Sequence, residues 1–426
     1  MKDSSHRAAS LAEALLGAAQ LIAAVLGGRN FDVALAAAPL SGVTRAAAMD
    51  LAYSTLRACG RGDFLLARLL ERPLQDKTAR GLLLAALARL EARPDEAHTT
   101  VDQAVSAAAR VSHGRFKGLV NGVLRNFLRR REELLANADA DPVAHWQHPA
   151  WWIARLRQDH PAHWEGILAA GNSHPPMCLR VNRRRVTSAD YLAQLDAAGV
   201  AAHSRDDVAI LLEKPLPVER LPGFGAGLCS VQDWGAQAAA RLLDARDGMR
   251  VLDACAAPGG KAAHVLEFAR VELTALDADA ARAARITDNL ARLGLMATVK
   301  VADARAVGDW WDGRPYHRIL ADVPCSASGV VRRHPDAKWL RRESDIAGFA
   351  ATQKAILDAL WRTLAPGGKM LYATCSVFGE ENDRQVEAFV DRHGDARRLP
   401  TTIEAQQHHL PDAEHDGFYY ALLQKD

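Results

Sequence analysis

The feature that most constrains the fold is the alternation of short apolar runs with amphipathic segments after residue 248. Strands that alternate with helices form a parallel sheet with helices on both faces. A final apolar run over 417–424 has no helix after it and predicts one more strand. The second half of the chain is therefore expected to be an α/β domain. The other predicted strands are Met249–Ala254, Glu272–Asp277, Thr298–Ala302, His317–Asp322 and Lys369–Thr374.

The first part of the chain predicts an all-helical domain. Up to about residue 137 it is rich in Ala and Leu at helical spacing, and strand-like runs are nearly absent. A stretch rich in Asp, Ala and Pro, from Asn137 to Pro149, breaks this periodicity and predicts a linker. The segment from Arg110 to Arg131 contains seven cationic side chains and no acid. This concentration of positive charge suits either phosphate contacts or a solvated helix face.

A mixed pattern lies between these two parts and predicts a small α/β subdomain. Met177–Val181 reads as a strand, and Thr187 with Asp190 has the spacing of a capping box ahead of a helix that ends at Gly199. We therefore predict three domains, at 1–140, 145–230 and 231–426. Two more groups of basic residues could contact phosphates, and the second of them could equally be a solvated helix face: Arg180, Arg183, Arg184 and Arg185, and then Arg332, Arg333, His334, Lys338, Arg341 and Arg342.

Composition narrows the cellular setting. The 426 residues are 49% hydrophobic and 24% charged, which is typical of a globular protein. No uncharged apolar stretch reaches the roughly 20 residues needed to span a bilayer, and Ala14–Gly28 reads as a helix, not a signal peptide. The six cysteines form no CxxC pair, so neither a disulfide framework nor a zinc site is indicated. We expect a cytoplasmic monomer that uses no membrane and no metal.

The sharpest local motif is a strand that runs into a glycine-rich turn and a helix, from Val251 to Lys261. Adjacent glycines let a ligand approach the backbone beside a helix N-terminus. The spacing is not GxGxxG, and Ala262 replaces the Ser or Thr that a P-loop uses to hold magnesium. We predict that this turn binds a cofactor through Ala254, Cys255, Ala256, Ala257, Pro258, Gly259, Gly260 and Lys261.

Three acids at successive strand ends narrow the choice of cofactor. Asp277 ends the second strand, Asp303 follows the third, and Asp322 ends the fourth. The carboxyl ends of parallel strands meet at one edge, where Asp277 can accept hydrogen bonds from ribose hydroxyls. Acids there would repel the pyrophosphate of a nicotinamide cofactor but suit a cationic methionyl group. The sequence therefore predicts S-adenosyl-L-methionine, bound by these three residues and the turn.

Two cysteines, Cys325 and Cys375, also follow predicted strands at this edge. Thiols beside a methyl donor suit methylation of carbon 5 of a pyrimidine, because a thiolate that adds to carbon 6 makes carbon 5 nucleophilic. Asp322 is placed to hydrogen-bond cytosine N3, and Pro324 leaves a carbonyl free for the exocyclic amine. Cys255 reads as a backbone contributor to the turn. The residues alone do not decide which cysteine attacks.

Four motifs together resemble the RNA cytosine-C5 methyltransferases of the Nol1/Nop2/Sun family. The resemblance implies a Rossmann-like, class I S-adenosyl-L-methionine-dependent sheet. It also implies that Cys375 is the nucleophile and that Cys325 assists release of the product. DNA cytosine methyltransferases attack with their Pro-Cys residue instead, so the second cysteine favours RNA. The motifs are LDACAAPGGK at 252–261, DVPCS at 322–326, ATCS at 373–376 and DGFYYA at 416–421.

The resemblance extends upstream. Met177–Asn182 and the VQD at 231–233 are similar to the family's extra RNA-binding subdomain, and Phe116–Arg125 is similar to NusB-like RNA-binding domains. A NusB-like domain joined to this catalytic half implies a bacterial enzyme that methylates 16S ribosomal RNA and must expose a stacked cytosine. Transfer RNA as substrate, a non-enzymatic RNA-binding or antitermination factor, and a nicotinamide oxidoreductase are the alternatives. Ala262, where the family usually has Thr, is a small departure.

Overall fold

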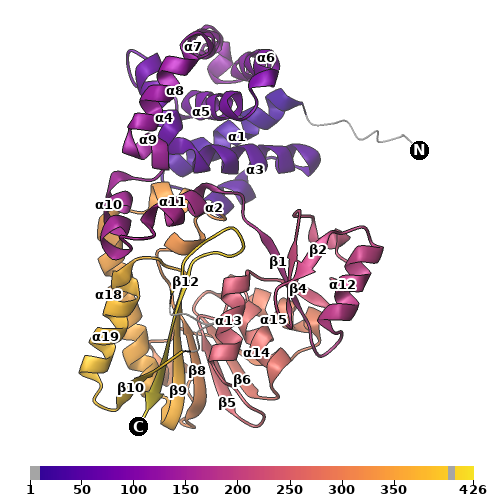
Figure 1. Ribbon diagram of the computed structural model, residues 1–426, viewed down its shortest axis with the longest axis vertical. Coiled ribbons are helices and arrows are strands. Elements are labelled where there is room, and N and C mark those ends of the chain that lie inside the picture. The colour runs from indigo at the N-terminus through magenta and orange to yellow at the C-terminus, as the bar shows by residue number, and fades with distance from the viewer. Residues whose placement is uncertain (1–9, 402–407) are drawn as a thin grey trace. The chain divides into compact units, whose positions relative to one another are not determined.

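The computed structural model describes residues 10–401 and 408–426. The chain forms two compact units, one of residues up to Ser173 together with Val331–Glu343, and one of His174–Val330 together with Ser344–Asp426. The first unit is helical (Figure 1). Its α-helices are α1 Leu11–Leu26, α2 Phe31–Ala37, α3 Gly42–Arg57, α4 Cys59–Leu69, α5 Lys77–Ala92, α6 Ala97–Ala108, α7 Lys117–Arg129, α8 Arg131–Ala140, α9 Pro142–Trp146, α10 Ala150–Asp159, α11 Trp164–Asn172 and α17 Asp336–Leu340.

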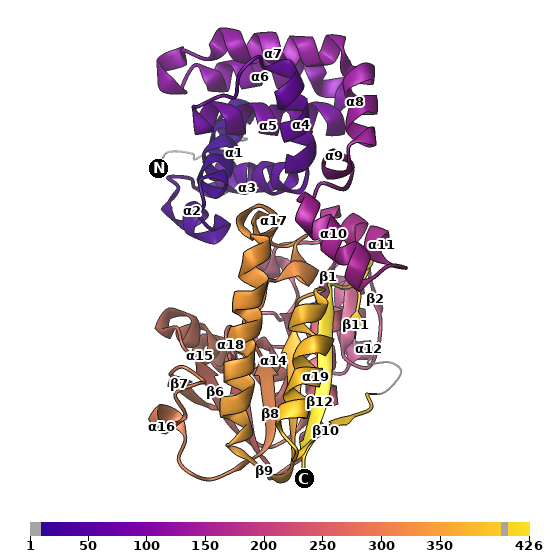
Figure 2. The same ribbon diagram turned by 90° about the vertical axis from the view of Figure 1, so that its left-hand side faces the viewer.

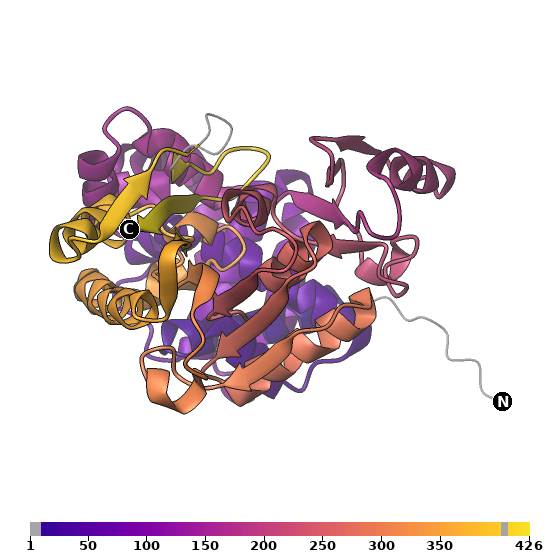
Figure 3. The same cartoon turned by 90° about the horizontal axis from the view of Figure 1, so that it is seen from below.

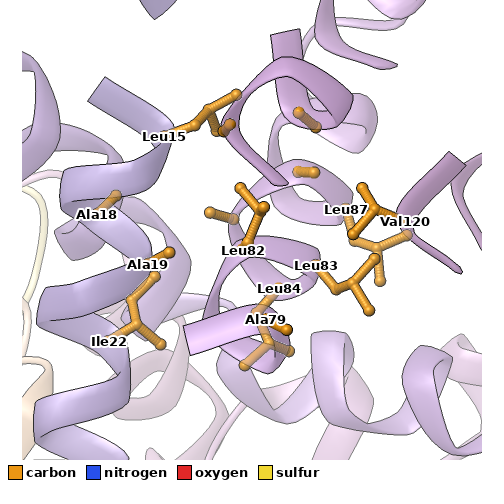
Figure 4. Close-up of a cluster of buried hydrophobic side chains, with 14 of the residues drawn as sticks. Leu15, Ala18, Ala19, Ile22, Ala79, Leu82, Leu83, Leu84, Leu87 and Val120 are labelled. Carbon is orange, nitrogen blue, oxygen red and sulfur yellow. The ribbon is translucent and has the colours of Figure 1, made fainter. Parts of the chain in front are cut away.

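Helices α1 and α5 form the centre of this unit. Leu15 and Ile22 of α1 and Leu82 and Leu87 of α5 belong to one buried cluster, which Figure 4 shows in close-up. A Cβ added at Gly81 would lie 2.5 Å from the carbonyl oxygen of Ala19, so only glycine lets the two helices approach this closely. Each buried leucine contributes about 1.5–3 kcal/mol relative to an exposed one. The Ala- and Leu-rich pattern therefore forms the predicted helical core.

The predicted linker at 137–149 is wrong, because most of it is helical. Helix α8 continues to Ala140, and α9 begins at once with Pro142. The Asp141 carboxylate caps α9 by accepting hydrogen bonds from the backbone N–H groups of Val143 and Ala144, both at 2.9 Å. Asp followed by Pro is a favourable start for a helix as well as a break in one.

The segment 331–343 belongs to the helical unit although it follows the Cys325 motif in sequence. The buried Lys338 ammonium donates hydrogen bonds to the carbonyl oxygens of Arg57 and Gln147, at 3.0 and 3.1 Å, and to Asn172 Oδ1 at 2.8 Å. Arg332 is also buried. The prediction that these two cations hold phosphates is therefore wrong, since protein oxygens already surround Lys338 and burial removes Arg332 from solvent.

The second unit contains two sheets. The small one has the order β2-β3-β1-β4, with every pairing antiparallel. The capping box is confirmed: Thr187 Oγ1 accepts a hydrogen bond from the N–H of Asp190, and Gly199 beyond the helix has a φ of +70°. Figure 3 shows this sheet and α12 as a lobe beside the large sheet. Its elements are β1 Met177–Val181, α12 Ser188–Ala197, β2 Ala202–Ser204, β3 Ala209–Leu212 and β4 Cys229–Val231.

The large sheet has the order β10-β12-β9-β8-β5-β6-β7 in the described residues, and β11 pairs with β12. Strands β9, β8, β5, β6 and β7 run parallel, and β12 is antiparallel to β9. The predicted strands and the Rossmann-like fold class are confirmed, whereas β10 and β11 were not predicted. The strands are β5 Arg250–Ala254, β6 Glu272–Asp277, β7 Thr298–Val301, β8 Tyr316–Asp322, β9 Leu364–Thr374, β10 Ala396–Leu399, β11 His408–His409 and β12 Phe418–Lys425.

Helices cover both faces of this sheet (Figures 1 and 2). Val251 packs in one core with α13, α14 and α15, and the next residue, Leu252, packs in another core with α18 and α19. Because β5, β6, β8 and β9 run parallel, their carboxyl ends lie at one edge of the sheet, where ligands bind in folds of this type. The helices are α13 Trp234–Leu242, α14 Gly260–Phe268, α15 Ala280–Leu293, α16 Val307–Trp310, α18 Glu343–Trp361 and α19 Asp383–Arg392.

Two features are absent from residues 10–401 and 408–426. No helix there combines the length and apolar character needed to cross a lipid bilayer. Within the same residues, no group of three or more His, Cys, Asp or Glu side chains is arranged to hold a metal ion. The three predicted domain ranges stay predictions.

Candidate active site

The turn between β5 and α14 exposes its backbone at the carboxyl edge of the sheet. Cys255 and Gly259 have left-handed backbones, with φ of +62° and +95°. Position 259 favours glycine for two reasons: L side chains rarely adopt this φ, and an added Cβ would lie 3.1 Å from Ile286. A Cβ at Gly260 would meet only Gln232 Nε2, at 3.7 Å, so the front of the turn is open. A ligand can therefore approach the backbone here, as the sequence predicts.

Asp277 closes one side of this turn. Its Oδ2 accepts a hydrogen bond from the N–H of Ala257, and its Oδ1 accepts one from the N–H of Asp279, both at 3.1 Å. The carboxylate is thereby fixed next to the turn, and each oxygen keeps a lone pair for a ribose hydroxyl. Asp303 follows the neighbouring strand β7, and a hydrogen bond from Arg305 holds the pKa of Asp303 below its usual range.

Asp253 lies at the end of β5 beneath the turn. The residue is 1% exposed, and neither carboxyl oxygen has a hydrogen-bond partner among the described residues. Burial, together with the charge of Asp322, raises the pKa of Asp253 well above its usual value. The turn is thus lined by carboxyl groups and by open backbone. This set fits a nucleoside that carries a cationic group, as S-adenosyl-L-methionine does, better than it fits a pyrophosphate.

Lys261 and Asp322 form an ion pair at the centre of the edge. Lys261 Nζ lies 2.5 Å from Asp322 Oδ2, and their side chains are 13% and 29% exposed. Burial lowers the pKa of Lys261, but the charges of Asp322, Cys375 and Asp253 outweigh burial and raise it. Lys261 therefore carries a positive charge close to Cys375. Its ammonium is directed at Asp322, a pairing that the sequence did not suggest.

The two predicted catalytic cysteines meet at this edge. Strands β8 and β9 are parallel neighbours, with Asp322 opposite Ala373. The loops that follow these strands bring Cys325 Sγ to 3.2 Å from Cys375 Sγ. Both residues are partly exposed, whereas Cys59, Cys178 and Cys229 are buried elsewhere in the fold. Cys255 is a poor thiolate, because burial and three nearby aspartates raise its pKa to about 12.

The two thiols have different environments. The hydrogen bond with Cys375, burial, and the charges of Cys375 and Glu381 raise the pKa of Cys325 well above its usual value. Cys325 therefore keeps its proton at neutral pH, and either sulfur can be the donor in its contact with Cys375 Sγ. Cys375, by contrast, lies close enough to Lys261 for the two side chains to interact electrostatically.

A buried polar cluster beneath the cysteines was not predicted. It consists of Ser326, Ser328, Gln353, Ser376 and Glu381, which are all at most 2% exposed. The sequence signal was only the serine that follows each cysteine. The Pro324 carbonyl is not free as the sequence suggested, because it accepts a hydrogen bond from Gln353 Nε2 at 3.0 Å. One lone pair of that oxygen is left for a substrate amine.

Three family models match the chain in consecutive segments. The NusB family model matches residues 13–129, and a model described as a ferredoxin-like domain of RsmF/B-like methyltransferases matches residues 148–219. The model described as 16S rRNA methyltransferase RsmB/F matches residues 240–424. These matches fall on most of the small sheet, most of the helical region and the large sheet.

Relatives and solved structures agree with these models. The chain is 44% identical to proteins named Ribosomal RNA small subunit methyltransferase B from Serratia proteamaculans (91% of this chain, 92% of the relative) and Pseudomonas putida (96% and 98%). The crystal structure of PH0851 has the same fold, with a TM-score of 0.80 at 23% identity over 96% of this chain and 99% of that one. A methyltransferase homologue from Pyrococcus horikoshii gives 0.59 at 24% identity over 67% and 97%. Sequence identity over nearly the whole length thus confirms the resemblance, and the chain belongs to the RsmB/F family of 16S rRNA methyltransferases.

Proposed function

We propose that this protein transfers a methyl group from S-adenosyl-L-methionine to carbon 5 of a cytosine in 16S ribosomal RNA, through a transient bond between Cys375 and carbon 6. The observation that carries the proposal is the pair of thiols, 3.2 Å apart, at the carboxyl edge of a methyltransferase sheet. The names of the relatives support ribosomal RNA of the small subunit as the substrate. The cofactor supplies an electrophilic methyl group bound to a sulfonium.

The protein's own groups perform the remaining work. Cys375 Sγ attacks carbon 6, and the Lys261 ammonium lies close to that sulfur. Attack sends electron density to N3, where Asp322 relays a proton supplied by its ion-pair partner, the Lys261 ammonium. The carbon 4–carbon 5 double bond of the resulting enamine then supplies the electron pair that bonds to the methyl group, and the electrons of the methyl–sulfur bond stay with the sulfur of the donor. Water must be excluded from this edge so that the electrostatic contacts keep their strength.

Release of the product uses the second thiol. A base removes the carbon 5 proton, the electrons of that C–H bond re-form the carbon 5–carbon 6 double bond, and the bond from carbon 6 to Cys375 breaks. Cys325 holds its proton 3.2 Å from the departing sulfur. Its hydrogen bond stabilises the thiolate that leaves, so the step is assigned to Cys325.

Analysis of the methylated nucleoside tests the proposed function. Purified protein is incubated with 16S ribosomal RNA and methyl-labelled S-adenosyl-L-methionine, and the RNA is digested to nucleosides. We expect the label in 5-methylcytidine, at one position when the RNA is mapped by bisulfite sequencing. Label on a ring nitrogen or a ribose oxygen would contradict the chemistry. Label in transfer RNA incubated in a parallel reaction, with none in 16S RNA, would contradict the substrate.

The exposed face of α7 supports RNA binding by the helical unit. Lys117, Arg125 and Arg129 are exposed and recur at multiples of four residues, so they form one stripe along the helix. The adjacent Gly118 and Gly122 have nothing within 4 Å of an added Cβ, so the helix backbone beside the stripe is open to solvent. This stripe lies within the basic block that the sequence indicated.

Neutralising the α7 stripe should weaken RNA binding and its salt dependence together. For Lys117→Gln, Arg125→Gln and Arg129→Gln combined, the slope of log affinity against log salt should shrink by about 2 to 3. The matched control removes three exposed arginines elsewhere in the unit: Arg29, Arg72 and Arg93. Filter binding at several salt concentrations measures both slopes. An unchanged slope in the stripe variant would mean that this face of α7 is solvated and does not contact RNA phosphates.

A further inference from the structure

We propose that Glu381 is the positioning residue of this active site: its one carboxylate ties the loop of Cys325 to the loop of Cys375 and thereby sets the distance between the two sulfurs. The inference rests on the proposed function, because it assigns Glu381 a role in the same reaction. Glu381 ends a 3₁₀ turn, Gly379–Glu381, that precedes α19. The residue is 0% exposed.

Four donors converge on the two oxygens of Glu381. Oε1 accepts hydrogen bonds from the N–H of Ser326 at 2.8 Å and from Gln353 Nε2 at 3.1 Å. Oε2 accepts hydrogen bonds from Ser326 Oγ and Ser376 Oγ, both at 2.5 Å. Ser326 directly follows Cys325, and Ser376 directly follows Cys375. A single side chain therefore holds the residue next to each sulfur.

Asn382, the residue after Glu381, also fixes the Cys375 loop through hydrogen bonds. Asn382 Nδ2 donates to the carbonyl of Ser376 at 2.9 Å, and Asn382 Oδ1 accepts from Thr374 Oγ1 at 2.7 Å. Both neighbours of Cys375 are thus attached to one short segment. On the other side, Gln353 links Glu381 to the carbonyl of Pro324, the residue before Cys325.

A structural role alone does not account for a carboxylate here. Removing a carboxyl group from water is costly, and burial raises the pKa of Glu381 while the hydrogen bonds from Ser326 and Ser376 oppose that rise. Apolar side chains of similar volume usually stabilise a core as well or better. Unlike an apolar side chain, the carboxylate accepts hydrogen bonds from two loops at once. Covalent catalysis with two thiols requires that the Cys325 loop and the Cys375 loop be held at a fixed distance from each other.

Two substitutions at position 381 and one control test the inference. Glu381→Ala removes all four hydrogen bonds. Glu381→Gln keeps the acceptor for Ser326 N–H and Gln353, and its amide can donate to the two serine hydroxyls, which can rotate to accept. Val386→Ala truncates a fully buried side chain of α19 that belongs to an apolar core, so it destabilises the helix that follows Glu381 without removing a hydrogen bond to either loop.

The expected result is a loss of kcat without a comparable loss in the binding of RNA or S-adenosyl-L-methionine. A misplacement of about 1 Å at a reacting group costs about 100-fold in rate, so Glu381→Ala should lower kcat about 100-fold. The KM for RNA and for S-adenosyl-L-methionine should stay within about threefold, because the four hydrogen bonds lost in this variant involve no residue of the basic stripe or of the β5–α14 turn. Glu381→Gln should recover kcat to within about tenfold of wild type. Val386→Ala should keep kcat at temperatures below its own unfolding.

The controls separate this inference from the proposed function. Wild-type protein that forms no 5-methylcytidine would overturn the proposed function, whatever Glu381 does. Active wild type with an unimpaired Glu381→Ala would overturn only the inference, as would a Glu381→Ala loss confined to KM. If Glu381→Ala does not fold, Ser326→Ala and Ser376→Ala replace it, and each should lower kcat about tenfold by removing one hydrogen bond. Normal kcat in both would then overturn the inference.

Discussion

Replacement of Cys375 with alanine should abolish methyl transfer. We expect turnover to fall by more than about 10⁴-fold, the scale on which loss of a covalent nucleophile acts. No other thiol can substitute, because Cys325 keeps its proton and the pKa of Cys255 is about 12. RNA and S-adenosyl-L-methionine should bind within about threefold of wild type, since the alanine disturbs neither the β5–α14 turn nor α7. Methyl-transfer assays and equilibrium binding measure the two effects separately.

Cys178→Ala is the matched control for this loss. Cys178 is a buried thiol in the small sheet, so its replacement removes the same atom from the same unit but away from the site. Cys178→Ala should keep normal turnover below its unfolding temperature. Turnover in Cys375→Ala that matches this control would contradict the assignment of the nucleophile.

Replacement of Cys325 with alanine should trap protein joined to RNA. Cys375 can still attack carbon 6, but the hydrogen bond that stabilises the departing thiolate is lost. The adduct should therefore accumulate and survive denaturing electrophoresis as a slow band that contains both labelled RNA and protein. Multiple turnover should fall sharply while the first methyl transfer proceeds.

The double variant Cys325→Ala with Cys375→Ala controls the adduct experiment. It should form no slow band, because the sulfur that makes the bond is absent. A band that persists in the double variant would mean that another residue bonds to RNA. Normal turnover with no adduct in Cys325→Ala would remove Cys325 from the release step.

Much of the catalytic half could be predicted because its signals are local. The strands were read from apolar runs, and β6 lies at the predicted residues, Glu272–Asp277. The aspartates and cysteines follow these strands, and parallel topology then places them at one edge. The Thr187–Asp190 capping box was readable for the same reason, since both partners lie within one turn.

The rest depends on contacts that sequence periodicity does not encode. The segment 331–343 has the charge of a phosphate-binding run, yet Lys338 meets three oxygens that are 166 to 281 residues away in the chain. Glu381 likewise stands in an acidic stretch that reads as solvated surface. Its buried role appears only when β8 and β9 bring Ser326 and Ser376 together.

Mass spectrometry of the trapped adduct tests the central claim most directly. Trypsin places the two cysteines in separate peptides, Ile319–Arg332 and Met370–Arg384. Wild-type protein is reacted with RNA whose target cytidine carries fluorine at carbon 5, which blocks release, and is then digested with nuclease and trypsin. A methylated nucleotide bonded to Cys375 in the second peptide is the predicted result. A nucleotide on Cys325, or methylated RNA that never bonds to protein, would contradict the claim.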